Sequence, residues 1–174
     1  KGGEYCKWYG NLWLELLWGE GGKYFKSDPK ATANNEDCYF KEGITFTGAG
    51  SKGVSFRLLP ENSVFDTGSR SIFSKGVDTF VLLSILNSSL GFYVFDCLNP
   101  TVNTTVGDVK RMPYIEPTET AKKMLHTFSK LCSDIQRHIR QFRIEEVNYT
   151  HSPIGTSSMP TEELSRYYDY ENGL

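Results

Sequence analysis

The sequence has no apolar run long enough to span a bilayer, because its longest candidate, residues 80–98, is interrupted by Asn87, Ser88, Ser89 and Asp96. It shows no signal-peptide pattern and no initiator methionine, since it opens on Lys1. We therefore expect no membrane association, a cytoplasmic location and an origin in a larger intracellular protein. A content of 39% hydrophobic and 14% aromatic residues over 174 residues predicts a folded domain and excludes a disordered chain.

Signatures of catalysis and metal binding are also missing. The four cysteines are widely spaced and form no Cys-x-x-Cys pair, which favours free thiols. The three histidines form no His-x-x-x-His pair, and no Gly-x-Ser-x-Gly elbow is present. Residues 48–53 are rich in glycine but lack the spacing of a phosphate loop, so we expect a hairpin connection there. We expect no catalytic residue, metal site or cofactor site, and a standalone hydrolase is disfavoured because no nucleophile and base are paired.

The overall charge shows no basic surplus. A net charge of −2 is not that of a free-standing nucleic-acid binder. However, residues 118–143 carry six Lys/Arg against two Asp/Glu, whereas residues 144–174 carry one against six. The basic segment is thus masked in the sum by an acidic one.

Short β-rich segments dominate the first half of the chain, and helical spacing dominates the second. The pattern predicts an α+β fold with a mixed or antiparallel twisted β-sheet, packed helices and one long C-terminal amphipathic helix. The expected strands are 12–18, 39–40, 44–47, 54–59, 64–65 and 114–115, with turns at 48–50, 60–62 and 67–69. The expected helices are 77–86 and 90–98, with a short turn or helix stub in 107–113.

Residues 118–143 form the clearest element, with Thr118 as the expected N-cap. One stripe holds its apolar residues, namely Ala121, Met124, Leu125, Phe128, Leu131, Cys132, Ile135, Ile139 and Phe142. The stripe is typical of a helix packed on its own domain, and the alternative is an arm that docks on another domain or subunit. We expect a domain at 1–117, this helix at 118–143 and a linker with an acidic tail at 144–174.

Basic and aromatic residues occur together at a few places. Lys7-Trp8-Tyr9 lies near the start, and Arg70 and Ser71 fall in a segment that we expect to be an exposed loop. Arginine in such a loop reaches guanine edges or phosphates, although a salt bridge or simple exposure is an equal alternative. Lys110-Arg111, near a chain reversal, has the geometry to hold a phosphate, with the same alternatives.

Several segments match known proteins in order along the chain. They are Lys1-Gly2-Gly3-Glu4-Tyr5 with Lys7-Trp8-Tyr9-Gly10, residues 39–45, residues 71–73, residues 86–88 with Phe92, and residues 98–103 with 106–110 and Pro113. Over residues 1–115 the sequence resembles large adenine-specific DNA methyltransferases of the PglX type, from BREX phage-defence systems, and related type IIG restriction-modification enzymes. The matching region is similar to the target-recognition domain of TaqI-like methyltransferases and of type I specificity subunits. Cys6 departs from the pattern, which has a basic residue before Lys7.

The resemblance implies a parent protein that binds S-adenosylmethionine, flips out an adenine and methylates its exocyclic amine. Neither the cofactor loop nor the Asn-Pro-Pro-aromatic motif is present here, so these residues would read double-stranded DNA beside a catalytic domain of the same parent chain. The DNA-binding candidates are Lys7, Trp8, Tyr9, Arg70, Ser71, Thr101, Asn103, Lys110 and Arg111. The alternative is a protein-protein interaction module of a multi-subunit assembly.

Overall fold

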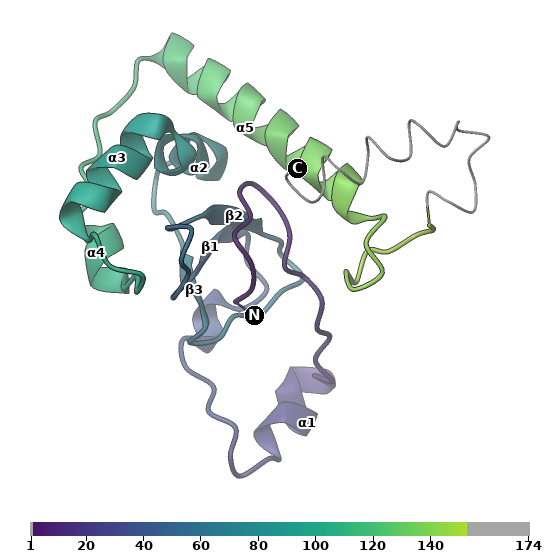
Figure 1. Ribbon diagram of the computed structural model, residues 1–174. Coiled ribbons are helices and arrows are strands. Elements are labelled where there is room, and N and C mark those ends of the chain that lie inside the picture. The colour runs from purple at the N-terminus through teal and green to yellow at the C-terminus, as the bar shows by residue number, and fades with distance from the viewer. Residues whose placement is uncertain (1, 153–174) are drawn as a thin grey trace.

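The computed structural model describes residues 2–152 and has the expected α+β architecture (Figure 1). Its sheet is fully antiparallel and has the strand order β2-β1-β3. The strands are β1 (Gly43–Thr47), β2 (Phe56–Leu59) and β3 (Ser69–Ile72). The predicted acidic tail beyond residue 152 lies outside the described residues.

The predicted helices are confirmed, and each begins at a side chain that caps it. They are α2 (Thr79–Asn87), α3 (Ser89–Leu98), α4 (Val106–Lys110) and α5 (Glu119–Arg140). The caps are Asp78, Ser88, Thr105 and, as predicted, Thr118. Each cap accepts a hydrogen bond from a backbone N–H of the first turn, which satisfies a donor that has no partner inside the helix.

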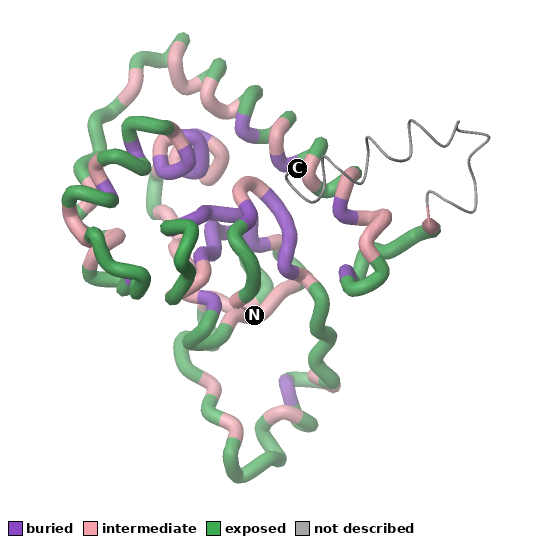
Figure 2. Tube along the Cα trace, in the orientation of Figure 1, coloured by how far each residue is buried: buried purple, intermediate pink, exposed green. Residues whose placement is uncertain are grey.

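The core lies between the sheet and α2. Phe46 and Phe56 of the sheet and Leu83 of α2 are fully buried, and α5 packs along α2 on the side away from the sheet. In Figure 2 the buried residues accordingly concentrate on the strands and α2. Close packing of aromatic rings here means that truncating either phenylalanine to alanine would cost about 3–5 kcal/mol.

The N-terminal segment extends the sheet beyond β2. The N–H of Trp8 donates to the carbonyl of Phe56 at 2.9 Å, and the N–H of Leu58 donates to the carbonyl of Trp8 at 2.8 Å. Trp8 pairs with Arg57 in a single parallel bridge. The edge of β2 is therefore covered by chain from the same molecule.

Between this segment and β1 the chain leaves the sheet (Figure 1). This excursion contains η1 (Glu20–Gly22), α1 (Lys23–Lys26) and η2 (Glu36–Cys38). The ring of Trp18 stacks on Phe25 with 5.6 Å between ring centroids and meets Phe40 edge-on at 5.3 Å. These aromatic contacts, rather than backbone pairing, hold the excursion together.

Four of the predicted strands are wrong. Residues 12–18, 39–40, 64–65 and 114–115 form no strand, because single backbone hydrogen bonds such as Phe40 to Ser63 do not build a ladder. Leu14, Leu16 and Leu17 are exposed instead. The reverse error occurs at Ser69–Ile72, which was expected to be turn and loop but is β3. An edge strand with one partner needs little apolar alternation, so its pattern resembled a loop.

Within the described residues no single helix is long and apolar enough to cross a membrane. Only α2 and α3 taken together meet that length and composition, as a pair bent by 69°.

Candidate nucleic-acid interface

Two loops far apart in sequence meet at one end of the sheet. One connects β1 to β2, and the other connects α3 to α4. The N–H of Gly50 donates to the carbonyl of Val102 at 3.0 Å, and the N–H of Thr104 donates to the carbonyl of Gly48 at 2.9 Å. Ala49 and Asn103 form an antiparallel bridge between them. The two loops thus form one surface, which we call the loop-pair surface.

Arg70 fastens this surface to β3. Its Nη1 donates to the carbonyl of Thr104 and, at 3.5 Å, to the carbonyl of Gly48. The sequence analysis placed Arg70 in an exposed loop, and this was wrong, because it lies on a strand and is half-buried. The guanidinium therefore spans the two loops from within and positions them.

A polar network fixes the loop before α4. The Asp108 carboxylate accepts from the Thr105 hydroxyl at 2.7 Å and from the Asn99 side-chain amide at 2.8 Å. The Asn99 amide oxygen accepts from the Thr101 hydroxyl at 2.6 Å. Hydrogen bonds from the Thr105 hydroxyl and backbone N–H hold the pKa of Asp108 below its usual value. The network presents Asn103 on a loop of set shape.

Exposed polar and cationic side chains lie on this surface and at the end of the adjoining helix α4. Asn103, Lys110 and Arg111 are exposed, as is Lys52 in the β1–β2 loop. The Nη2 of Arg111 donates to the carbonyl of Leu98 at 2.6 Å, which leaves part of its guanidinium open to solvent. Sequence reasoning missed Lys52, although a lysine at the tip of a glycine-rich loop was a visible signal.

Ser71 lies at an apolar cavity beside this surface. The cavity measures about 330 Å³, and Phe73, Met112 and Lys110 are among the residues that line it with Ser71. Within the described part of the chain, the buried Ser71 hydroxyl has no hydrogen-bond partner. Ser71 and Lys110 thus line the same cavity although they are distant in sequence.

The structure places Lys7, Trp8 and Tyr9 elsewhere, beside β2 at the opposite edge of the sheet from β3. The Lys7 ammonium donates to the carbonyl of Asn87 at 3.0 Å. Tyr9 is buried in the core, where its hydroxyl accepts from the Asn148 amide at 2.8 Å. These residues therefore serve packing in this structure and do not join the loop-pair surface.

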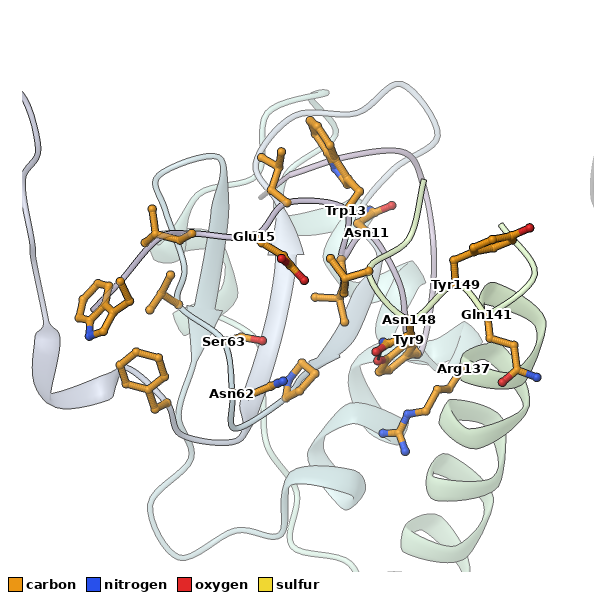
Figure 3. A pocket seen from close by; sticks show the side chains of 18 of the residues that line it. Tyr9, Asn11, Trp13, Glu15, Asn62, Ser63, Arg137, Gln141, Asn148 and Tyr149 are labelled. Carbon is orange, nitrogen blue, oxygen red and sulfur yellow. Dashed lines mark hydrogen bonds between the residues drawn. The ribbon is translucent and has the colours of Figure 1, made fainter. Parts of the chain in front are cut away.

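A second hollow lies between residues 11–16 and the C-terminal end of α5 (Figure 3). This cleft holds about 900 Å³. Its uncharged polar lining consists of amide and hydroxyl side chains, and its two labelled charged groups are Glu15 and Arg137. The Arg137 guanidinium stacks over the Tyr9 ring with 4.8 Å to the centroid. The balanced charge suits a neutral ligand or peptide better than a phosphate backbone.

The described residues offer little for covalent or metal chemistry. No group of three or more His, Cys, Asp or Glu side chains among them is arranged to hold a metal ion. Burial raises the pKa of the Cys6 thiol, whose Sγ donates to the carbonyl of Tyr9 at 2.9 Å. A protonated, buried thiol is a poor nucleophile, so Cys6 has a packing role.

Comparison with known proteins found similarity to two methyltransferases, whereas no family model matches the chain. The chain is 35% identical over 119 residues, 67% of its length, to the adenine-specific methyltransferase BrxX of Escherichia coli O9:H4 (strain HS). It is 31% identical over 121 residues, 65% of its length, to the adenine-specific methyltransferase PglX of Lacticaseibacillus casei (strain Zhang). In both cases the chain spans 10% of the relative's length. The chain is therefore related in sequence to one segment of the BREX-type adenine-specific methyltransferases.

Proposed function

We propose that this chain is the DNA sequence-recognition module of a larger adenine-specific DNA methyltransferase, acting in phage defence or restriction-modification. It has no catalytic role alone. S-adenosylmethionine and the target adenine would be bound by the rest of the parent protein. The two methyltransferase relatives support this assignment, since they are about ten times longer than the part matched here.

The observation that carries the proposal is the gathering of predicted DNA-contacting residues on the loop-pair surface. Thr101 and Asn103 lie on this surface, and Arg70 clamps the loops from behind. Arg111 donates to Leu98 at the start of the α3–α4 loop, and Lys110 ends the adjoining helix α4. Asparagine makes paired hydrogen bonds to adenine, and lysine and arginine bind phosphates. A loop of fixed shape with one amide and nearby cations has the groups that DNA recognition needs. The amide would contact a base, and the cations would hold the DNA backbone through its phosphates.

Fluorescence anisotropy with a labelled 30-base-pair duplex of mixed sequence tests the phosphate contacts. Lys110→Ala should weaken binding by the 174-residue chain about threefold to tenfold and reduce the slope of log affinity against log salt by about one. Lys30→Ala is the matched control, because Lys30 is an exposed lysine in the distant excursion. If Lys110→Ala and Lys30→Ala both bind DNA with the affinity and salt slope of the unsubstituted 174-residue chain, the loop-pair surface is not the DNA site.

A test of base recognition requires the longer parent protein, because the measurement is the DNA sequence that the parent methylates. Asn103→Ala should change which DNA sequences the parent methylates, while its affinity for S-adenosylmethionine stays the same. An unchanged methylation map would remove Asn103 from the set of base-reading residues.

A further inference from the structure

The helix α5 buries the wrong side chains for an amphipathic helix that packs only on its own domain. Ser129 and Ser133 are fully buried, whereas Met124, Phe128, Leu131 and Ile135 are 49% to 58% exposed. We call these four apolar residues the outer seam. In Figure 2 the buried positions of α5 lie on its side toward the rest of the molecule.

Small residues explain the inner face. Serines let α5 approach closely, and the Ser84 hydroxyl of α2 donates to the carbonyl of Leu125 at 2.8 Å. The Ser133 hydroxyl donates to the carbonyl of Trp8 at 3.5 Å. The contact with α2 and the N-terminal segment therefore uses small and polar groups, and the apolar stripe predicted from sequence is left largely on the outside.

The spacing of the outer seam identifies what would cover it. Its members are separated by four, three and four residues, which is the alternating repeat of a helix that pairs with another helix along a shared seam. A β-strand or an irregular segment does not match this repeat, because its side chains alternate with a period of two. The complementary surface is the apolar face of a second amphipathic helix.

The charged groups beside the seam, Lys130 and Arg137 against Asp134, leave a surplus of one positive charge. Asp134 is held by Lys130 at 3.5 Å and by Arg137 at 3.6 Å, so the carboxylate is already neutralised. On the other border lie the half-buried Leu125 and Cys132. An apolar strip with so little net charge at its rim fits an apolar helix face better than a phosphate backbone.

We propose that the outer seam pairs with an amphipathic helix supplied by another part of the same longer methyltransferase chain. This inference rests on the proposed function, because it needs a parent chain. The length of the relatives supports that occupant, since nine-tenths of each lies outside the matched segment. The seam thereby fixes the recognition module relative to the rest of the enzyme.

Hydrogen exchange of α5, compared between the 174-residue chain and the longer polypeptide read from the source gene, tests the pairing. Backbone amides of α5 should exchange about tenfold more slowly in the longer chain. Leu131→Asp should abolish that difference, whereas Lys123→Asp should preserve it, because Lys123 is exposed on another face of the same helix. Sedimentation of the 174-residue chain, with and without Leu131→Asp, is measured in parallel to detect a dimer.

The outcomes separate the two proposals. Equal exchange of α5 in the short and long chains would overturn the seam pairing and leave the DNA-recognition proposal standing. A dimer of the 174-residue chain that Leu131→Asp dissociates would also overturn it, because the occupant would then be a second copy. A source gene that encodes no further domain would overturn both proposals together.

Discussion

One buried side chain, Asn87, joins the end of α2 to the start of β2. Its amide oxygen accepts from the N–H of Phe56 at 3.2 Å, and its amide nitrogen donates to the carbonyl of Phe56 at 2.9 Å. Asn87 thus does what a residue of a neighbouring strand would do. It also lies in one of the segments by which the sequence resembles the methyltransferases, which gives that match a structural reason.

Replacement of Asn87 by alanine should lower the free energy of unfolding by about 1–3 kcal/mol, because the N–H of Phe56 would be buried without a partner. The carbonyl of Phe56 would keep its bond from Trp8. Urea denaturation measures the loss. Asn62→Ala, which changes an exposed amide, should stay within about 0.5 kcal/mol. Equal effects of the two variants would mean that the Asn87 pair contributes nothing specific.

Two of the residues that the sequence predicts as DNA contacts, Arg70 and Tyr9, are used differently in the structure. Arg70 was expected to be exposed and instead bridges two loops from a half-buried strand position. Tyr9 was a candidate contact and is buried in the core. A single sequence does not distinguish an arginine that binds a ligand from an arginine that only holds backbone carbonyls. Both roles use the same guanidinium donors.

At the scale of elements, a contact between two side chains links α2 and α5. The Nδ1 of His126 lies 3.0 Å from a carboxylate oxygen of Asp78, and Asp78 also caps α2 by accepting from Val81. Burial raises the pKa of Asp78, but the Val81 N–H and His126 outweigh it and hold that pKa below its model-compound value of 3.8. The ionised carboxylate is therefore favoured in the folded protein.

This shift fixes the sign of a pH effect. The stability that Asp78 contributes is present at neutral pH and is lost as the pH falls through its folded pKa, below about 3.8. Asp78→Asn keeps a good helix cap but removes the charge, so it should lower stability at pH 7 by under about 1 kcal/mol, since the pair is largely exposed. The gap between the two proteins should close below pH 4, as followed by thermal unfolding across pH.

The exposed Asp37→Asn, away from both helices, is the control and should match the original sequence at every pH. If the stability difference between Asp78→Asn and the original sequence persists unchanged at pH 3, the contact depends on shape and not on charge.

Helices were predicted well and strands poorly, for a physical reason. A cap and a 3.6-residue period are local, and so α5 was recognisable from residues 118–143 alone. A strand exists only where another segment pairs with it, and residues 12–18 have the composition without the partner. The sequence of α5 alone also does not show which face of the helix is buried. That depends on how Ser129 and Ser133 fit against α2 and the N-terminal segment.

At the scale of the whole molecule, a buried ionic network joins the two ends of the described chain. The guanidinium of Arg140 contacts Glu4 at 2.9 Å and Glu146 at 3.3 Å. The Glu146 carboxylate also accepts from the N–H groups of Asn11 at 3.1 Å and Leu12 at 2.9 Å. The sequence analysis had assigned Glu146 to an acidic tail, since nothing local distinguishes it from its exposed neighbour Glu145.

These adjacent glutamates give a matched pair for mutation. Glu146→Ala should destabilise the chain by about 2–4 kcal/mol, because it leaves two backbone N–H groups without an acceptor and takes one of two carboxylate partners from the buried Arg140. Glu145→Ala removes only an exposed ion pair with Arg143 and should cost under about 1 kcal/mol. Chemical denaturation gives both values, and similar losses for the two would refute the network as a structural link.

The placement of these two links has a mechanical meaning for α5. One link, at His126, lies in its second turn, and the other, at Arg140, is its last residue. A straight helix of 22 residues is about 33 Å long and resists bending far more than a loop does. Anchored near both ends, α5 behaves as a strut, so a load on its middle is transmitted to the start of α2 and to the N-terminal segment beside β2.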